Sequence, residues 1–199
     1  MTILAKLTIV GCAALLAAAS PVATASAKLT LVGSPCAAEG ASPSEGGTIL
    51  PLSLGTNHNT RDEVFFAEAP HGGLLTSWTV VIGYETKPFL LKLSVAGKVG
   101  DRHRYYIAQQ TEPKMVKRGL NVFYTRMWIV KGETIALVSV GDDKIPFCST
   151  TSAHDAVGIS HKGLDRDESG SFGPALGRFM IPAAAVLEPD NGPPAARRR

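Results

Sequence analysis

The sequence predicts an all-β protein, an antiparallel β-sandwich of the jelly-roll or immunoglobulin type with about 8 to 10 short strands. Apolar and polar residues alternate with a period of two in several segments, which is typical of half-buried strands. The 199 residues include 20 Gly and 13 Pro, and only 19% are charged, a composition that favours short strands and turns over helices. No convincing amphipathic helix of three turns occurs after the N-terminal segment.

The first 27 residues have the pattern of a secretory signal peptide. Lys6 precedes an apolar run at residues 7–19, and Ala25-Ser26-Ala27 fits a cleavage site, so we expect an exported, extracellular protein that starts near Lys28. An alternative is a lipoprotein signal with an acylated Cys12, although the apolar run continues past that cysteine. No later segment is apolar over the length of a membrane helix, so we expect no membrane span.

Removal of this segment changes the cysteine and charge counts. Cys36 and Cys148 remain as one pair, which predicts a disulfide in an oxidising compartment. The surplus of basic residues then lies in the three arginines at 197–199, because residues 28–196 carry 16 basic and 17 acidic side chains. A nearly neutral domain does not predict a nucleic-acid-binding surface.

The alternation places the strands along the chain. It predicts strands at residues 74–82, 89–95 and 102–109, and a hairpin of residues 121–130 and 134–140 across the turn Lys131-Gly132-Glu133. Weaker strand patterns occur at residues 29–33, 49–54, 64–67, 145–148, 178–181 and 184–187. Loops are predicted at residues 40–47 and 149–177, a single domain over residues 28–187, and a flexible Pro/Arg-rich tail at residues 188–199.

The hairpin predicts a candidate binding surface. Its core side would consist of Phe123, Met127, Ile129, Ile135 and Leu137. Its other side would carry Tyr124, Arg126 and Trp128 in a row. Aromatic rings in such a row can stack on sugar rings, and an arginine between them can donate hydrogen bonds to hydroxyl or carboxylate groups. The alternative is that a second sheet or a loop covers this side.

A second pattern suggests a metal ion. Asp165, Asp167 and Ser169, followed by Gly170, match the first half of a calcium-binding loop, in which alternate oxygen ligands point inward. The twelfth position of such a loop would be Leu176 instead of a carboxylate, so the segment is not an EF-hand. Any calcium ion here would need further ligands from another loop, and an ordinary charged loop is the alternative.

Signatures of catalysis are weak. The sequence lacks a G-x-S-x-G elbow, an H-E-x-x-H motif and a glycine-rich phosphate loop. Residues 70–73 resemble part of an oxyanion-hole motif but indicate only a turn without the elbow, and Ser160-His161 is a pair of common loop residues. His154, Asp155 and His161 could suit zinc, although their spacing matches no standard ligand set.

Three motifs carry a resemblance to a known group of proteins. They are Asn121-x-Phe123-x-Thr125-Arg126, Val130-Lys131-Gly132-Glu133-x-Ile135-Ala136-Leu137 and Val186-x-Glu188-Pro189-Asp190. Together they resemble uncharacterised secreted β-sandwich proteins of actinobacteria, which implies export and a sandwich fold but no activity. An Asp-rich, calcium-repeat-like tail often follows the Glu-Pro-Asp element in those proteins. Here residues 191–194 and the arginines follow, so no calcium-linked role of the tail carries over.

These observations predict a secreted, noncatalytic module that binds a glycan, a cell wall or a protein surface, since binding needs only a scaffold and suitable contacts. One alternative is a structural surface protein without a discrete site. The other is an extracellular hydrolase with paired carboxylates, although no feature of the sequence places two carboxylates at a catalytic separation.

Overall fold

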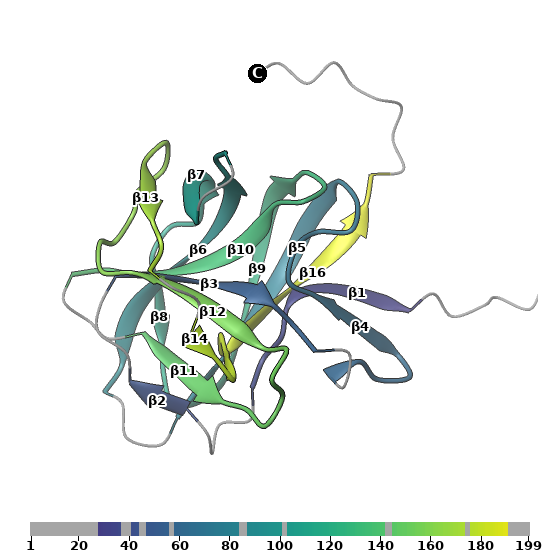
Figure 1. Ribbon diagram of the computed structural model, residues 1–199, viewed down its shortest axis with the longest axis horizontal. Helices are drawn as coiled ribbons and strands as arrows, with labels where there is room; N and C mark the ends of the chain where they lie inside the picture. Colours follow the sequence, from purple (N-terminus) through teal and green to yellow (C-terminus); the bar gives the residue numbers. More distant parts are fainter. Residues whose placement is uncertain are drawn as a thin grey trace, which may run out of the picture.

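The fold consists of β-strands joined by turns and loops (Figure 1). The computed structural model describes residues 28–36, 41–43, 47–55, 58–83, 87–100, 103–141, 145–173 and 176–190, and these contain no α-helix. The strands are β1 (Leu29–Gly33), β2 (Ala41–Pro43), β3 (Thr48–Ser53), β4 (Glu63–Phe66), β5 (Gly73–Ile82), β6 (Phe89–Lys98), β7 (Arg104–Gln110), β8 (Lys114–Val116), β9 (Gly119–Ile129), β10 (Thr134–Ser139), β11 (Pro146–Ser149), β12 (Ala156–Ser160), β13 (Ser169–Ser171), β14 (Leu176–Gly177), β15 (Phe179–Met180) and β16 (Ala183–Pro189).

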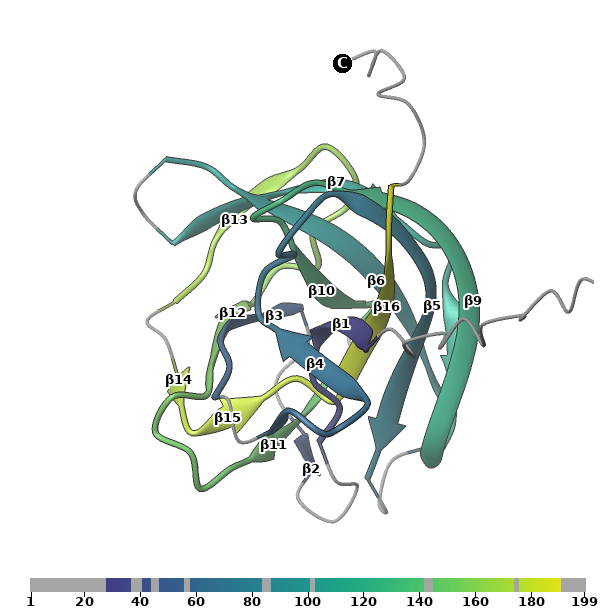
Figure 2. The ribbon, with the colours of Figure 1, turned by 90° about the vertical axis from the view of Figure 1, so that its right-hand side faces the viewer.

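The strands form three sheets. A five-stranded sheet has the order β4-β1-β16-β5-β9, and an eight-stranded sheet has the order β13-β7-β6-β10-β3-β12-β14 with β8 beside β6. A small third sheet has the order β15-β11-β2. Neighbouring strands are antiparallel except for β1 and β4. The predicted all-β, mainly antiparallel class is therefore confirmed, and the longer strands curl around one side of the molecule (Figure 2).

One apolar core joins the two larger sheets. Trp78, Met127 and Ile129 enter it from the five-stranded sheet, and Leu93 and Ile135 enter it from the eight-stranded sheet. A second cluster lies on the other face of the eight-stranded sheet, where Tyr105, Ile107 and Ala136 pack with residues after β12. Those residues are Leu164 and Phe172. Both faces of the central eight-stranded sheet are therefore covered.

The predicted hairpin is wrong. β9 pairs with β5, whereas β10 pairs with β6 and β3, so the chain passes from one sheet to the other at the turn. Gly132 allows this turn with a φ of 84°. The predicted core side is nevertheless correct, because Met127 and Ile135 meet in the shared core from opposite sheets. Alternation identifies the buried side of a strand, but it does not identify the strand's partner.

The predicted long loop at residues 149–177 is also wrong. This segment contains β12, β13 and β14, and β12 lies between β3 and β14 inside a sheet. Val157 and Leu164 are fully buried. β13 and β14 have only three and two residues, which is too short to show alternation, and for this reason the number of strands exceeds the prediction. β16 continues to Pro189, two residues past the predicted domain boundary at residue 187.

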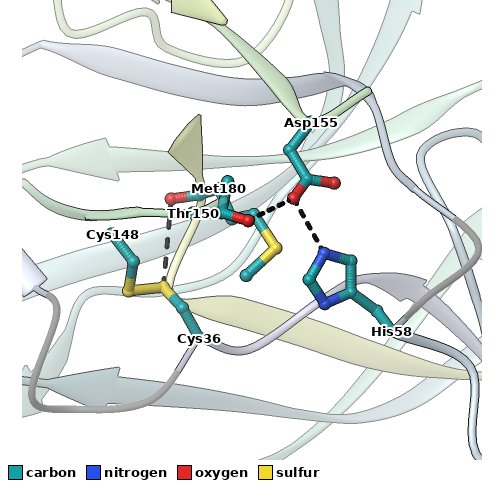
Figure 3. Close-up of a disulfide and its surroundings, with 6 residues drawn as sticks. All are labelled: Cys36, His58, Cys148, Thr150, Asp155 and Met180. Atoms are coloured by element: carbon teal, nitrogen blue, oxygen red, sulfur yellow. Dashed lines mark hydrogen bonds and ion pairs between the residues drawn. A yellow bond between two sulfur atoms is a disulfide. The ribbon is translucent and has the colours of Figure 1, made fainter. Parts of the chain in front are cut away.

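The disulfide between Cys36 and Cys148 is confirmed. It joins the segment after β1 to β11, with the two Cα atoms 6.0 Å apart and 112 positions apart in the sequence. Both cysteines are buried and pack against Met180 of β15 (Figure 3). The bond therefore ties the small third sheet to the five-stranded sheet.

The predicted signal segment with Cys12 and the three C-terminal arginines lie outside the described residues. Among the residues that the structure does describe, no helix is long and apolar enough to cross a membrane.

We predict that replacing Cys36 and Cys148 together by Ala lowers the free energy of unfolding by about 4 to 5 kcal/mol, because the bond closes a long loop in the unfolded chain. Urea unfolding of the oxidised protein and of the double variant measures this difference. A loss below about 1 kcal/mol would contradict the role of the bond in stability.

Candidate functional site

One row of side chains projects from the outer face of β9. We call Leu120, Val122, Tyr124, Arg126 and Trp128 the β9 row. Arg126 is exposed, and the exposed fractions are 88% for Tyr124 and 50% for Trp128. The alternative that a second sheet covers Tyr124, Arg126 and Trp128 is thus not what the structure shows.

Packing on the opposite face of β9 fixes this orientation. Met127 and Ile129 are buried in the core, and Phe123 packs on the fully buried Trp78 of β5 with ring centroids 4.7 Å apart. Successive side chains of a strand point to opposite faces, so the residues between these core positions must point outward. Tyr124 and Trp128 are therefore exposed because the residues next to them in sequence point toward the core.

The edge of β9 is closed at Trp128. β9 is the last strand of its sheet, and its neighbour β5 lies on one side only. On the other side, Gln109 of β7 donates from Nε2 to the Trp128 carbonyl at 2.9 Å and accepts from the Trp128 N–H at 3.2 Å. The Gln109 side chain satisfies both backbone groups of Trp128, so a partner would approach Trp128 from the face and not as an added strand.

β5 provides the surface beside the β9 row. Ser77 lies opposite Tyr124, and Thr79 lies opposite Val122, with both hydroxyl residues half-buried. Cross-strand partners lie on the same face, so these small side chains leave the Tyr124 ring open from the side of β5. β5 contains no charged residue.

The residues of the predicted calcium loop are held by protein partners. Asp165 accepts a hydrogen bond from Lys92 Nζ at 2.7 Å, and the Ser169 hydroxyl accepts one from Arg104 at 2.9 Å. Asp167 is exposed, and its carboxylate lies 3.8 Å from Arg166 Nε. Within the described part of the chain, no group of three or more His, Cys, Asp or Glu residues could hold a metal ion. The calcium site stays a prediction.

A buried carboxylate forms a cluster that the sequence did not predict (Figure 3). Asp155 is fully buried and accepts hydrogen bonds from the Gly55 N–H at 2.8 Å, from His58 Nε2 at 2.8 Å and from the Thr150 hydroxyl at 2.7 Å. His154, which the zinc hypothesis grouped with Asp155, is exposed. His58 is 97 positions from Asp155, and no local motif indicates that they meet.

The cluster holds Asp155 in its charged form. Burial acts to raise the pKa of Asp155, but the hydrogen bonds from Gly55, His58 and Thr150 outweigh burial and lower that pKa below its ordinary value of 3.8. The cluster joins the chain after β3 to the chain after β11. We call this cluster the clamp, because the hydrogen bonds to Asp155 link the two segments.

Two open pockets lie near this clamp. Their volumes are about 460 and 500 Å³, and both are lined in part by Ser53, Leu54 and Gly55. Phe65 and Phe66 of β4 make the first pocket largely apolar.

No protein-family model, curated protein or solved structure matches this chain. The resemblance to secreted actinobacterial proteins therefore stays an expectation, and function must be inferred from the site itself.

We predict that Asp155→Asn lowers the free energy of unfolding at pH 7 by about 1 to 3 kcal/mol, because an amide cannot accept all three donors. Because the pKa of Asp155 is lowered in the folded state, the charged carboxylate contributes its full stabilisation above pH 3.8. This contribution is lost as the pH falls through the lower pKa of the folded state. The variant should therefore lose less stability on acidification than the wild type.

Urea unfolding at a series of pH values measures this effect. Asp167→Asn, which changes an exposed carboxylate, is the matched control and should follow the wild-type curve. Parallel curves for Asp155→Asn and the wild type would contradict the prediction.

Proposed function

We propose that this protein is a secreted, noncatalytic module that binds an extracellular glycan through the β9 row. The exposure of Tyr124 and Trp128 on one sheet face is the observation that carries the proposal. Export is supported by the predicted signal segment and by the buried disulfide. The core shared by the two larger sheets supports a β-sandwich as the scaffold.

The geometry suits a chain of sugar rings. Tyr124 and Trp128 are four residues apart on one strand, which corresponds to roughly 13 Å at ~3.3 Å per residue. Each ring offers an apolar face for stacking against a pyranose, and Arg126, which lies between them on the strand, has a guanidinium that can donate hydrogen bonds. Ser77 and Thr79 of β5 add hydroxyl groups beside the row. The ligand would lie along the strand.

The buried carboxylates support a noncatalytic role. Asp155 is occupied by its three donors. Glu133, only 8% exposed, accepts from the Tyr106 hydroxyl at 3.1 Å and from the Val130 N–H at 2.8 Å. Both groups satisfy protein donors and stabilise turns, which differs from the two substrate-facing carboxyls of a glycoside hydrolase.

A protein surface is the second candidate ligand. Leu120 and Val122 are 67% and 55% exposed in the same row, and aliphatic side chains contribute more to protein interfaces than to sugar stacking. Substitution of Leu120 and Val122 distinguishes the two candidate ligands. Binding of a glycan would depend on the aromatic rings, whereas binding of a protein would depend on the whole β9 row.

We predict that Tyr124→Ala and Trp128→Ala each weaken glycan binding by roughly 2- to 10-fold, because each removes one stacking ring. Pull-down of the full protein on insoluble polysaccharides and purified cell walls, followed by titration with the retained material, measures the change. Leu176→Ala, which truncates an exposed side chain on β14, is the control and should bind like the wild type. Unchanged binding by the folded double variant Tyr124→Ala/Trp128→Ala would overturn the proposal.

A further inference from the structure

Basic residues are concentrated in the segment that contains β8 and β9. Residues 113–132 contain five of the chain's 20 Lys and Arg residues and none of its 17 Asp and Glu residues. The rest of the chain consequently has two more acidic than basic side chains. The five basic residues are Lys114, Lys117, Arg118, Arg126 and Lys131.

Four of these five basic residues lie on β9 or next to its ends. Lys117 and Arg118 come directly before β9, Arg126 lies within it, and Lys131 follows it. Lys117, Arg126 and Lys131 are exposed. At ~3.3 Å per residue, the eleven residues of β9 extend over roughly 36 Å. Basic residues are therefore found next to both ends of β9 and within the β9 row.

Among the described residues, no acidic side chain lies on β9 itself or on its neighbour β5. The neighbouring strand β5 has no charged residue, and the acidic residue closest in sequence after Lys131, Glu133, is buried and engaged by Tyr106 and Val130. Glu188 of β16 is exposed and lies opposite Leu74, which in turn lies opposite Trp128, so this carboxylate is on the same face as the β9 row but two strands away from it. A ligand on the β9 row would therefore meet an apolar and cationic surface.

We propose that the glycan bound by the β9 row is an acidic polysaccharide whose sugar rings carry carboxylate groups. The proposal rests on the proposed glycan-binding function and specifies its ligand. Arg126 lies two residues from both Tyr124 and Trp128, roughly 7 Å along the strand, so a carboxylate attached to a stacked ring would lie within reach of the guanidinium. The planar guanidinium can hold a carboxylate through two parallel hydrogen bonds.

The hydroxyl side chains beside the row favour a sugar over a lipid surface. Ser77 and Thr79 lie opposite Tyr124 and Val122, where a bilayer would place apolar chains. Hydroxyl groups of a sugar would offer a partner to Ser77 and a further partner to Thr79, whose hydroxyl donates to the Ala184 carbonyl at 3.5 Å, whereas acyl chains would offer none. An anionic bilayer is therefore an outcome of the test and not the proposal.

Polygalacturonate and its fully methyl-esterified form are suitable probes, because they share the same rings and differ in charge. Titration of the full protein should show roughly 10-fold tighter binding to the acid form at about 0.02 M salt, and the preference should shrink at about 0.2 M salt as screening increases. Arg126→Gln and the double variant Lys117→Gln/Lys131→Gln should reduce the preference for the acid form. Lys98→Gln, an exposed lysine at the end of β6, is the control and should keep the wild-type preference.

The outcomes distinguish failure of the acidic ligand from failure of the glycan-binding function. Equal binding of both forms at low salt would overturn the acidic ligand and leave the glycan-binding function standing. Binding of neither form would overturn both proposals. Binding of phosphatidylglycerol vesicles without binding of either polysaccharide would also overturn both, and it would assign the β9 row to a membrane surface.

Discussion

Burial of apolar side chains between the two larger sheets is the constraint on which the rest of the structure depends. Trp78, Met127 and Ile129 enter the core from one sheet, and Leu93 and Ile135 enter it from the other. Because side chains alternate along a strand, every core position on β9 sends its neighbour outward. Exposure of Tyr124 and Trp128 is thus a consequence of the core, and a shift of β9 by one residue would bury these rings and expose Met127 and Ile129.

The connections around β9 hold this register. The turn after β9 is stabilised by Glu133, whose carboxylate accepts from the Val130 N–H, and Gln109 of β7 binds both backbone groups of Trp128. The contact of Glu133 with Val130 fixes the turn at which the chain passes from the five-stranded sheet to the eight-stranded sheet. The contact of Gln109 with Trp128 links the edge of the five-stranded sheet to a strand of the eight-stranded sheet. The β9 row therefore lies on a strand that both sheets hold in place, and a rigid site loses less conformational entropy on binding.

The sequence allowed most of the longer strands to be predicted, because alternation is a local property. β5, β6, β7 and β9 all begin and end within a few residues of their predicted limits. Strand pairing could not be predicted in the same way, since β9 and β10 are adjacent in sequence but belong to different sheets. The exposed row was predictable from the side that Met127 and Ile129 occupy. The clamp at Asp155 was not, because His58 and Thr150 reach it from distant parts of the chain.

Hydroxyl-radical footprinting of the full protein, with and without acidic polysaccharide, tests most directly whether the β9 row is the binding surface. The account predicts that Tyr124 and Trp128 lose reactivity when the ligand is bound. Tyr106 of β7, which is 37% exposed and outside the row, should keep its reactivity. Protection confined to other residues, with Tyr124 and Trp128 as reactive as in the free protein, would contradict the account.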